Sequence, residues 1–191
     1  MRSLWMAIAL LLTATPLAAA DRSWSFRVFL DDREVGIHRF ELRDTAGGQE
    51  LRSNARFDVR FLGVPVYRYR HEAMERWRDD CLQSLYSQTD SNGKRQQVRS
   101  DFDQCVMSFA YWNPAILRAR QLINSQTGAL TDVTIDSLGA GAVGVRGKSQ
   151  VAEHYRLIGP KLSMDLWYAD GDWIGLDADT DGGHRLHYRL L

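Results

Sequence analysis

The sequence predicts a mainly β protein: a curved antiparallel meander, or an incompletely closed β-barrel, of about ten strands with one short helix. Three observations predict this fold class. Apolar and polar residues alternate with a period of two along most of the chain. Pairs of Asn, Asp and Gly separate the alternating segments. The segments follow one another with short connections, which favours antiparallel pairing of sequence neighbours.

The first twenty residues do not follow this pattern. Arg2 precedes an apolar run over residues 4–12, and three alanines end the segment at Ala20. This order is typical of a secretory signal peptide, and it predicts cleavage near Ala20 and a periplasmic or secreted location. An uncleaved anchor is the alternative, but the apolar run is too short to cross a bilayer, so we expect no stable membrane span. Residues 21–191 then form a single β-rich domain.

Strands of the N-terminal half are recognised by alternation, and their ends by turn residues. Ala55, Phe57 and Val59 alternate with polar residues, which is typical of a strand with one wet face. Asn92-Gly93 predicts a tight hairpin turn, since both residues tolerate a positive φ. The expected strands here cover residues 24–30, 35–42, 54–61, 66–78, 82–89, 94–101 and 105–111.

One segment predicts a helix. Asn113 is a favourable N-cap, Pro114 suits the first helical position, and residues 115–122 are mostly helix formers. The glycines between residues 139 and 147 are interpreted as a loose connection. The remaining expected strands cover residues 130–136, 149–158, 161–168, 173–177 and 185–191.

The long strand over residues 66–78 carries the candidate site. Its alternate residues place three arginines on one face, which we expect to be wet, and an aromatic and polar set on the other. That second face contains Tyr67, Tyr69, His71, Glu75 and Trp77. Apolar walls with a few polar groups are what a ligand cavity needs, so these five residues are the candidate site for a small apolar or lipid-like ligand. The alternative is that they pair with neighbouring strands or with water.

Charge and motifs exclude several classes of function. Basic and acidic residues balance at 24 each, and loss of residues 1–20 leaves one acid in excess. Such a chain has no excess charge to steer it onto nucleic acid or onto an anionic membrane. Asp177-x-Asp179-x-Asp181 resembles the start of a calcium loop, but Tyr188 stands where the bidentate acid should be. We therefore expect no metal and no other cofactor, and no catalytic motif can be recognised.

Cys81 and Cys105 are the two cysteines of the chain. In an exported protein two cysteines predict one structural disulfide. A redox or metal-binding pair is the alternative, but neither cysteine belongs to a C-x-x-C motif, and no nearby His completes a familiar ligand set.

Several short phrases are shared with a known family. They are Gly36-Ile37-His38, His71-Glu72-x-x-Glu75-x-Trp77 with Cys81-Leu82, Thr89-Asp90-x-Asn92-Gly93, Phe109-Ala110-Tyr111-Trp112-Asn113-Pro114, Asn124-x-Gln126-x-Gly128 and Leu166-Trp167-Tyr168. On these the chain resembles, over essentially all of residues 21–191, a family of exported bacterial proteins known only as a domain of unknown function. The resemblance implies no activity.

More remotely, the chain is similar to the lipoprotein-localisation carriers. Their fold is an open, curved antiparallel barrel in which helices plug an apolar concavity. The likeness implies that residues 114–122 act as the plug, although those carriers use several helices and this chain offers one.

These observations favour non-catalytic binding of an apolar or amphipathic ligand in a curved sheet. Two alternatives stay open. One is an envelope hydrolase that uses His71 with a carboxylate, either Glu75, which lies about 13 Å away along an extended strand, or an acid from a neighbouring strand. The other is an envelope interaction module whose exposed sheet edge pairs with a partner. The sequence does not indicate an oligomeric state.

Overall fold

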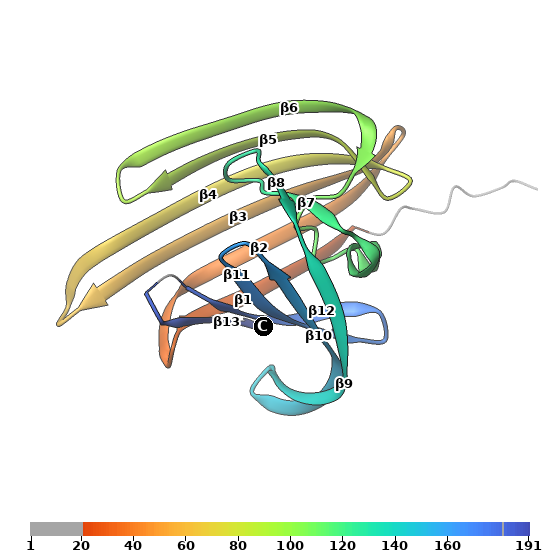
Figure 1. The fold of residues 1–191 in the computed structure, drawn as a ribbon. Helices are drawn as coiled ribbons and strands as arrows, with labels where there is room; N and C mark the ends of the chain where they lie inside the picture. Colours follow the sequence, from red (N-terminus) through yellow and green to blue (C-terminus); the bar gives the residue numbers. More distant parts are fainter. Residues whose placement is uncertain (1–20, 181) are drawn as a thin grey trace, which may run out of the picture.

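One antiparallel sheet of eleven strands organises the molecule (Figure 1). The structure is a computed structural model that describes residues 21–180 and 182–191. The sheet is not closed, so the predicted mainly β class and the predicted open, curved meander are confirmed. The predicted signal peptide lies outside the described residues.

Most strands match the segments expected from the sequence, but residues 94–106 form one strand in place of the two expected over 94–101 and 105–111, and β7 was not expected. The strands are β1 (Arg22–Leu30), β2 (Arg33–Thr45), β3 (Gly48–Phe61), β4 (Val64–Arg78), β5 (Cys81–Ser91), β6 (Lys94–Val106), β7 (Gln121–Ile123), β8 (Leu130–Asp132), β9 (Thr134–Val145), β10 (Lys148–Gly159), β11 (Leu162–Ala169), β12 (Asp172–Asp179) and β13 (Arg185–Leu190). β7 and β8 form a separate two-stranded sheet.

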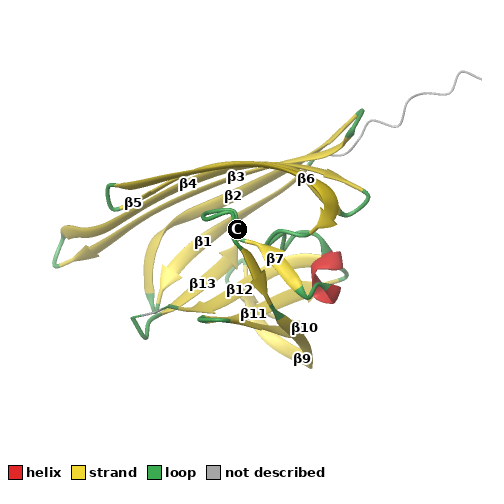
Figure 2. Ribbon diagram, turned by 45° about the horizontal axis from the view of Figure 1, so that its top comes forward, coloured by secondary structure: helices red, strands yellow, loops and turns green. Residues whose placement is uncertain are grey.

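Two groups of strands face each other across a concavity. The long strands β1 to β6 form one wall, and β9 to β13 form the other (Figures 1 and 2). Pairing of β1 with β13, from opposite ends of the described chain, joins the two walls, with Val28 opposite Tyr188. The order places β6 at one edge of the large sheet and β9 at the other.

The segment between β6 and β9 lies inside this concavity, and we call residues 107–133 the strap. It packs in the main apolar cluster together with residues of both walls. The buried side chains that it contributes are Ala110, Trp112, Ile116, Leu122, Ile123 and Val133. The strap occupies the place of the expected plug.

The strap is less helical than predicted. Asn113 does cap a helical turn, since its side-chain oxygen accepts a hydrogen bond from the amide of Ala115 at 2.9 Å. That turn is a short 3₁₀ helix, η1 (Pro114–Arg118), the red element in Figure 2, rather than a helix over residues 115–122. Leu122 and Ile123 are instead buried in an extended segment that pairs with β8. Burial of this segment outweighs its helix propensity.

The glycines between residues 139 and 147 form part of a hairpin, so the predicted loose connection there is wrong. β9 continues through Gly139, Gly141 and Gly144, and it pairs with β10 on both sides of them. A Cβ atom at Gly141 would stand 2.9 Å from the ring of Trp167. The glycines are needed because the end of this hairpin curls over β11 to β13, where it buries the second apolar cluster.

Cys81 and Cys105 form the predicted disulfide, which joins the start of β5 to the end of β6. The 4.8 Å between their Cα atoms is within the normal range for such a bridge. Among the residues that the structure describes, none belongs to a helix long and apolar enough to cross a membrane.

Candidate functional site

β4 is extended over the whole candidate segment, and its aromatic and polar set faces the concavity. His71, Glu75 and Trp77 are buried, whereas Arg68 and Glu72 on the other face are exposed. Antiparallel pairing with β3 and β5 fixes this orientation, with Ala55 and Thr89 on either side of His71. The five residues do not form one continuous site, because the strap covers one half of them.

Glu75 and Trp77 form the covered, inner half. The indole nitrogen of Trp77 donates to Oε2 of Glu75 at 3.0 Å, and the hydroxyl of Ser108 in the strap donates to the same oxygen at 3.0 Å. Trp77 also packs edge-to-face on Trp112 of the strap. Burial raises the pKa of Glu75 to about 7, although both hydrogen bonds oppose the shift. This half of the face is occupied by the protein itself.

His71 lies at the edge of the region that the strap covers. Its Nδ1 lies 2.8 Å from the hydroxyl of Thr89, and its Nε2 lies 3.4 Å from the hydroxyl of Ser125 in the strap. Burial lowers the pKa of His71 to about 4, so the imidazole is neutral at neutral pH. Neither hydroxyl is an acid, and the hydrogen bonds of Glu75 go to Trp77 and Ser108 instead. The structure therefore does not assemble His71 and Glu75 as an acid–base couple.

Tyr69 lies at the end of the strap, where it contacts Gln126, and Tyr67 lies beyond it, toward the tip of the β3–β4 hairpin. The Tyr69 hydroxyl donates to Oε1 of Gln126 at 3.0 Å, while its ring stacks on Phe57 with the ring centres 5.4 Å apart. Tyr67 is 38% exposed and shares a 2.8 Å hydrogen bond with Ser91. These two residues belong to the part of the face that is open to solvent.

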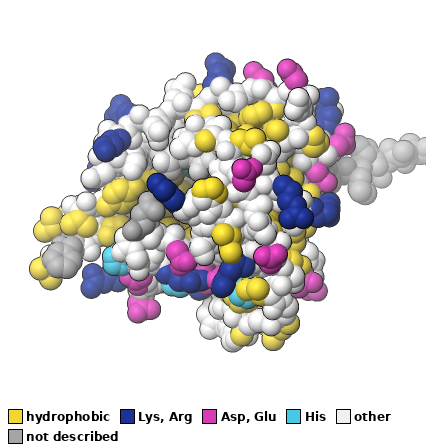
Figure 3. Space-filling view, in the orientation of Figure 1, with side chains coloured by type: hydrophobic (Ala, Val, Ile, Leu, Met, Phe, Trp, Pro, Cys, Tyr) yellow, Lys and Arg dark blue, Asp and Glu magenta, His cyan; other side chains and the backbone are white. Residues whose placement is uncertain are grey.

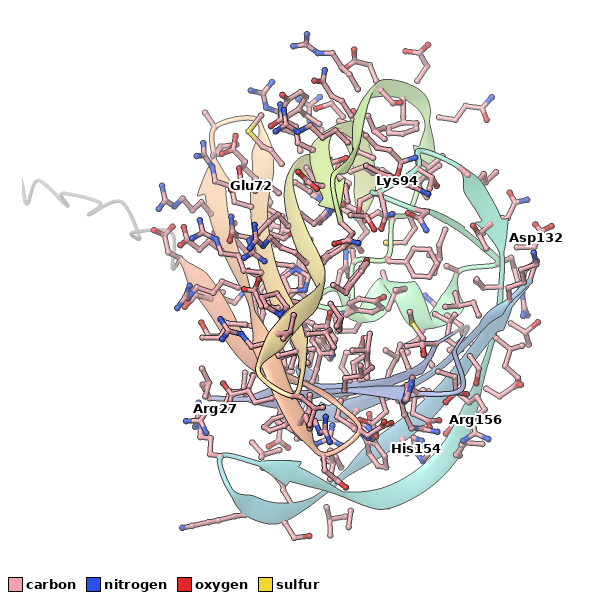
Figure 4. All side chains as sticks on the ribbon, turned by 90° about the vertical axis from the view of Figure 1, so that its left-hand side faces the viewer. Arg27, Glu72, Lys94, Asp132, His154 and Arg156 are labelled. Carbon is pink, nitrogen blue, oxygen red and sulfur yellow. A yellow bond between two sulfur atoms is a disulfide. The ribbon has the colours of Figure 1, made fainter. Side chains whose placement is uncertain are left out.

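A third apolar cluster surrounds this open part, and we call it the mouth cluster. Its members come from five neighbouring strands of the sheet, β4, β3, β2, β1 and β13. Val28, Val35, Ala55 and Phe57 are buried in it, and Leu30, Val59, Tyr69, Leu186 and Tyr188 are partly exposed. Figure 4 looks at this end of the molecule and shows side chains projecting between the two walls.

His38 of β2 stands at the base of the mouth cluster. Its ring stacks on Phe40 at 4.0 Å, and its Nδ1 lies 3.4 Å from the hydroxyl of Tyr188. Its Nε2 is buried, and no protein group among the described residues forms a hydrogen bond with it. Burial, reinforced by His71, lowers the pKa of His38 to about 3. A buried polar atom without a partner is unusual in a folded protein.

His38 is not among the candidate site residues expected from the sequence. The available signal was its position on the inward face of its strand, directly opposite the buried Phe26 and two residues before the buried Phe40. What could not be foreseen was the approach of Tyr188, which lies 150 residues away in the sequence.

The mouth cluster presents apolar area and uncharged polar groups. The two imidazoles are neutral, and burial raises the pKa of Tyr69 and of Tyr188 above the ordinary value, so both phenols keep their protons. Such a surface can hold an apolar chain and offer hydrogen bonds to a hydroxyl, ester or amide group.

The outer face of β10 to β13 carries charge instead. Asp165 is buried between His154, Arg156 and Arg185, and the first two are labelled in Figure 4. The calcium-loop resemblance falls partly on this face. Asp177 bonds His187 at 2.9 Å and Arg189 at 2.5 Å, Asp179 bonds Arg185, and Asp181 lies outside the described residues. In the part of the chain that the structure describes, no three His, Cys, Asp or Glu side chains gather as a metal site would require.

Comparison with known proteins gives one match. No curated protein and no solved structure matches the chain. Residues 26–191 match a family described as "Domain of unknown function (DUF6134)". The match includes β4, the strap and the mouth cluster, and the chain therefore belongs to this family of unknown function.

Proposed function

We propose that this protein binds an apolar or amphipathic ligand, without catalysis, at the mouth cluster. The ligand would lie against Phe57, Tyr69 and Tyr188, with its polar end near His38. We further propose that it acts in the periplasm or outside the cell, as the composition of residues 1–20 predicts.

One observation carries the proposal: the inner face of the sheet is covered by the strap over Glu75 and Trp77 but stays partly exposed at the mouth cluster. A protein that needed this face only for its own stability would gain by covering it completely, because each Å² of apolar surface removed from water contributes about 25 cal/mol. The unpaired Nε2 of His38 adds a hydrogen-bonding group in the same place.

Neutrality of the site indicates the chemistry of the ligand. An anionic or cationic group would lose its hydration in the cluster, and the polar side chains named there, His38, Tyr69 and Tyr188, carry no charge to oppose it. A hydroxyl, ester or amide needs only a hydrogen-bond donor or acceptor, which His38, Tyr69 and Tyr188 supply. The proposal therefore favours a neutral polar group on an apolar chain.

The proposed binding can be tested with N-phenyl-1-naphthylamine, a neutral apolar dye whose fluorescence rises on leaving water. We expect saturable binding at one site per chain, and we expect Val59→Asp, which places a charge in the mouth cluster, to weaken it at least tenfold. Val151→Asp is the matched control, because Val151 is 72% exposed and belongs to none of the apolar clusters. Absence of saturable binding, or equal weakening by both variants, would contradict the proposal.

The open edge of the sheet favours a second candidate, strand pairing with a partner. β6 is an edge strand of 13 residues. Five charged residues on this strand oppose pairing, which makes this candidate the weaker of the two; they are Lys94, Arg95, Arg99, Asp101 and Asp103. Strand pairing with a second copy predicts concentration-dependent dimerisation, measurable by analytical ultracentrifugation, that Gln97→Pro abolishes.

A further inference from the structure

The β3–β4 hairpin projects beyond the rest of the sheet. Pairing of β3 with β2 ends at Phe57, and pairing of β4 with β5 ends at Tyr69. The hairpin continues past both points to a turn at Leu62-Gly63, a reach of about 15 Å at 3.3 Å per residue. This projecting end is visible at the left of Figure 1.

The projecting end exposes apolar residues at its turn and along the start of β4. Leu62 is 88% exposed, Val64 is 61% exposed and Val66 is 52% exposed. The register of the hairpin shifts between Val59 and Arg60, so that Tyr67 lies opposite Val59 while Pro65 lies opposite Arg60 on the other face. The space-filling view shows hydrophobic side chains gathered at this end of the molecule (Figure 3). We call residues 62–67 the apolar tip.

Other hairpins of the same sheet show that an apolar turn is not required by the fold. Leu62-Gly63, Asn92-Gly93, Arg146-Gly147 and Asp170-Gly171 all combine a left-handed residue with a left-handed glycine. The first residue is polar in the other three turns. Among the described non-glycine residues with positive φ, Leu62 alone is apolar. Leucine is strained in this conformation and poorly solvated at this exposure, whereas asparagine would be neither. Folding and solubility therefore do not account for Leu62.

Positive charge lies directly behind the apolar tip. The hairpin carries exposed Arg60 and Arg68, and the turn of the neighbouring β5–β6 hairpin carries exposed Lys94 and Arg95. Asp58 is held by Arg68 at 3.4 Å and by Arg70 at 2.8 Å, and Asp90 is held by Arg95 at 3.5 Å. On these two hairpin ends, cations outnumber carboxylates by five to two, and both carboxylates are already paired.

We propose that the apolar tip inserts into the interfacial region of a bilayer that contains anionic lipid. Apolar residues at a turn that projects from the sheet are removed from water when the turn enters lipid, whereas a flat partner surface would cover only part of them. The arginines and Lys94 behind it would then stand at the level of the anionic headgroups, where each basic group adds to the attraction. This proposal concerns the outer end of the hairpin and does not depend on a ligand in the mouth cluster.

Vesicle flotation tests the proposal. The protein is the chain from Asp21, since every strand and apolar cluster described above lies within residues 21–191. The probes are vesicles of phosphatidylcholine alone and vesicles with 30% phosphatidylglycerol. We expect binding to the anionic vesicles, at least tenfold weaker binding to the neutral ones, and weakening of the anionic binding as salt is raised.

Leu62→Asn is the decisive variant, because it converts the turn to the Asn-Gly form already present at Asn92-Gly93. It therefore retains or improves folding, which thermal unfolding would verify. We expect it to weaken binding about tenfold or more, the effect of removing one inserted leucine. Val151→Asn removes another strongly exposed apolar side chain, far from the tip along the chain, and should leave binding unchanged.

Two results would overturn the proposal. One is failure of the unmodified chain to float with either kind of vesicle. If such a chain instead dimerises, and Leu62→Asn abolishes the dimer, the tip binds a second copy and not a membrane. The other is equal binding by the unmodified chain and Leu62→Asn. Dye binding at the mouth cluster is measured separately, so loss of one activity can be distinguished from loss of the other.

Discussion

Replacement of Glu75 by Gln should stabilise the protein, and more so as the pH rises. Gln preserves the shape of the side chain, and its carbonyl oxygen can accept the hydrogen bonds from Trp77 and Ser108. It removes the buried carboxyl group, whose pKa burial raises from 4.5 to about 7. Between these two values the unfolded chain releases the proton and the folded chain keeps it. Stability of the unmodified protein therefore falls through this range as the pH increases.

The magnitude follows from the two pKa values. At pH 5 the folded carboxyl is protonated and the unfolded one is mostly ionised, which costs the unmodified protein about 1 kcal/mol. At pH 8 the same linkage costs about 3 kcal/mol. The advantage of Glu75→Gln in unfolding free energy should thus grow by about 2 kcal/mol between pH 5 and pH 8.

Urea unfolding followed by tryptophan fluorescence at both pH values measures this difference. Glu72→Gln on the exposed face of the same strand controls for the change in net charge. If the difference between Glu75→Gln and the unmodified protein is the same at pH 5 and pH 8, the carboxyl is not held in a buried, protonated state, and the description of the covered half of β4 is wrong.

Three further predictions follow from the geometry. The unmodified protein should lose stability as the pH falls from 6.5 to 4, because the folded protein keeps His71 neutral while the unfolded chain protonates it. His71→Gln should reduce this loss of unfolding free energy by up to about 1.4 kcal/mol per pH unit. Urea titrations across this pH range measure the difference. Replacing both cysteines by serine should lower the unfolding free energy by about 3.5 kcal/mol, the loop entropy of a bridge across 24 residues, and an unchanged midpoint would contradict a structural role. Gly36→Ala should lower the unfolding free energy by about 3 kcal/mol or more, because the new Cβ would stand 1.9 Å from the carbonyl oxygen of Arg56. Gly147→Ala should lower it by about 1 kcal/mol, because no atom lies within 4 Å of its Cβ and only the positive φ is strained. Comparable melting temperatures for the two variants would refute this.

The sheet could be predicted because its signals are local. Alternation along β3 and β4 sets which residues face inward, and turn residues such as Asn92-Gly93 set where strands end. The same reasoning placed Tyr69, His71, Glu75 and Trp77 on one face of an extended strand, as the structure has them.

The division of that face into a covered and an open half could not be predicted. It depends on where the strap lies, and therefore on contacts such as Ser108 with Glu75 and Ser125 with His71, which join residues 33 and 54 positions apart. The short 3₁₀ helix has the same origin, since burial of Leu122 and Ile123 ends the helical turn early. The mouth cluster depends on the pairing of β1 with β13, which no local pattern encodes.

Native mass spectrometry tests the proposed function most directly, on protein expressed with residues 1–20 as its proposed export signal and purified from the periplasm without detergent. The account predicts a second species heavier than the chain from Asp21 by the mass of a lipid-like molecule, released by collisional activation and missing from Val59→Asp. A bare chain alone, with no dye binding at the mouth cluster, would contradict it.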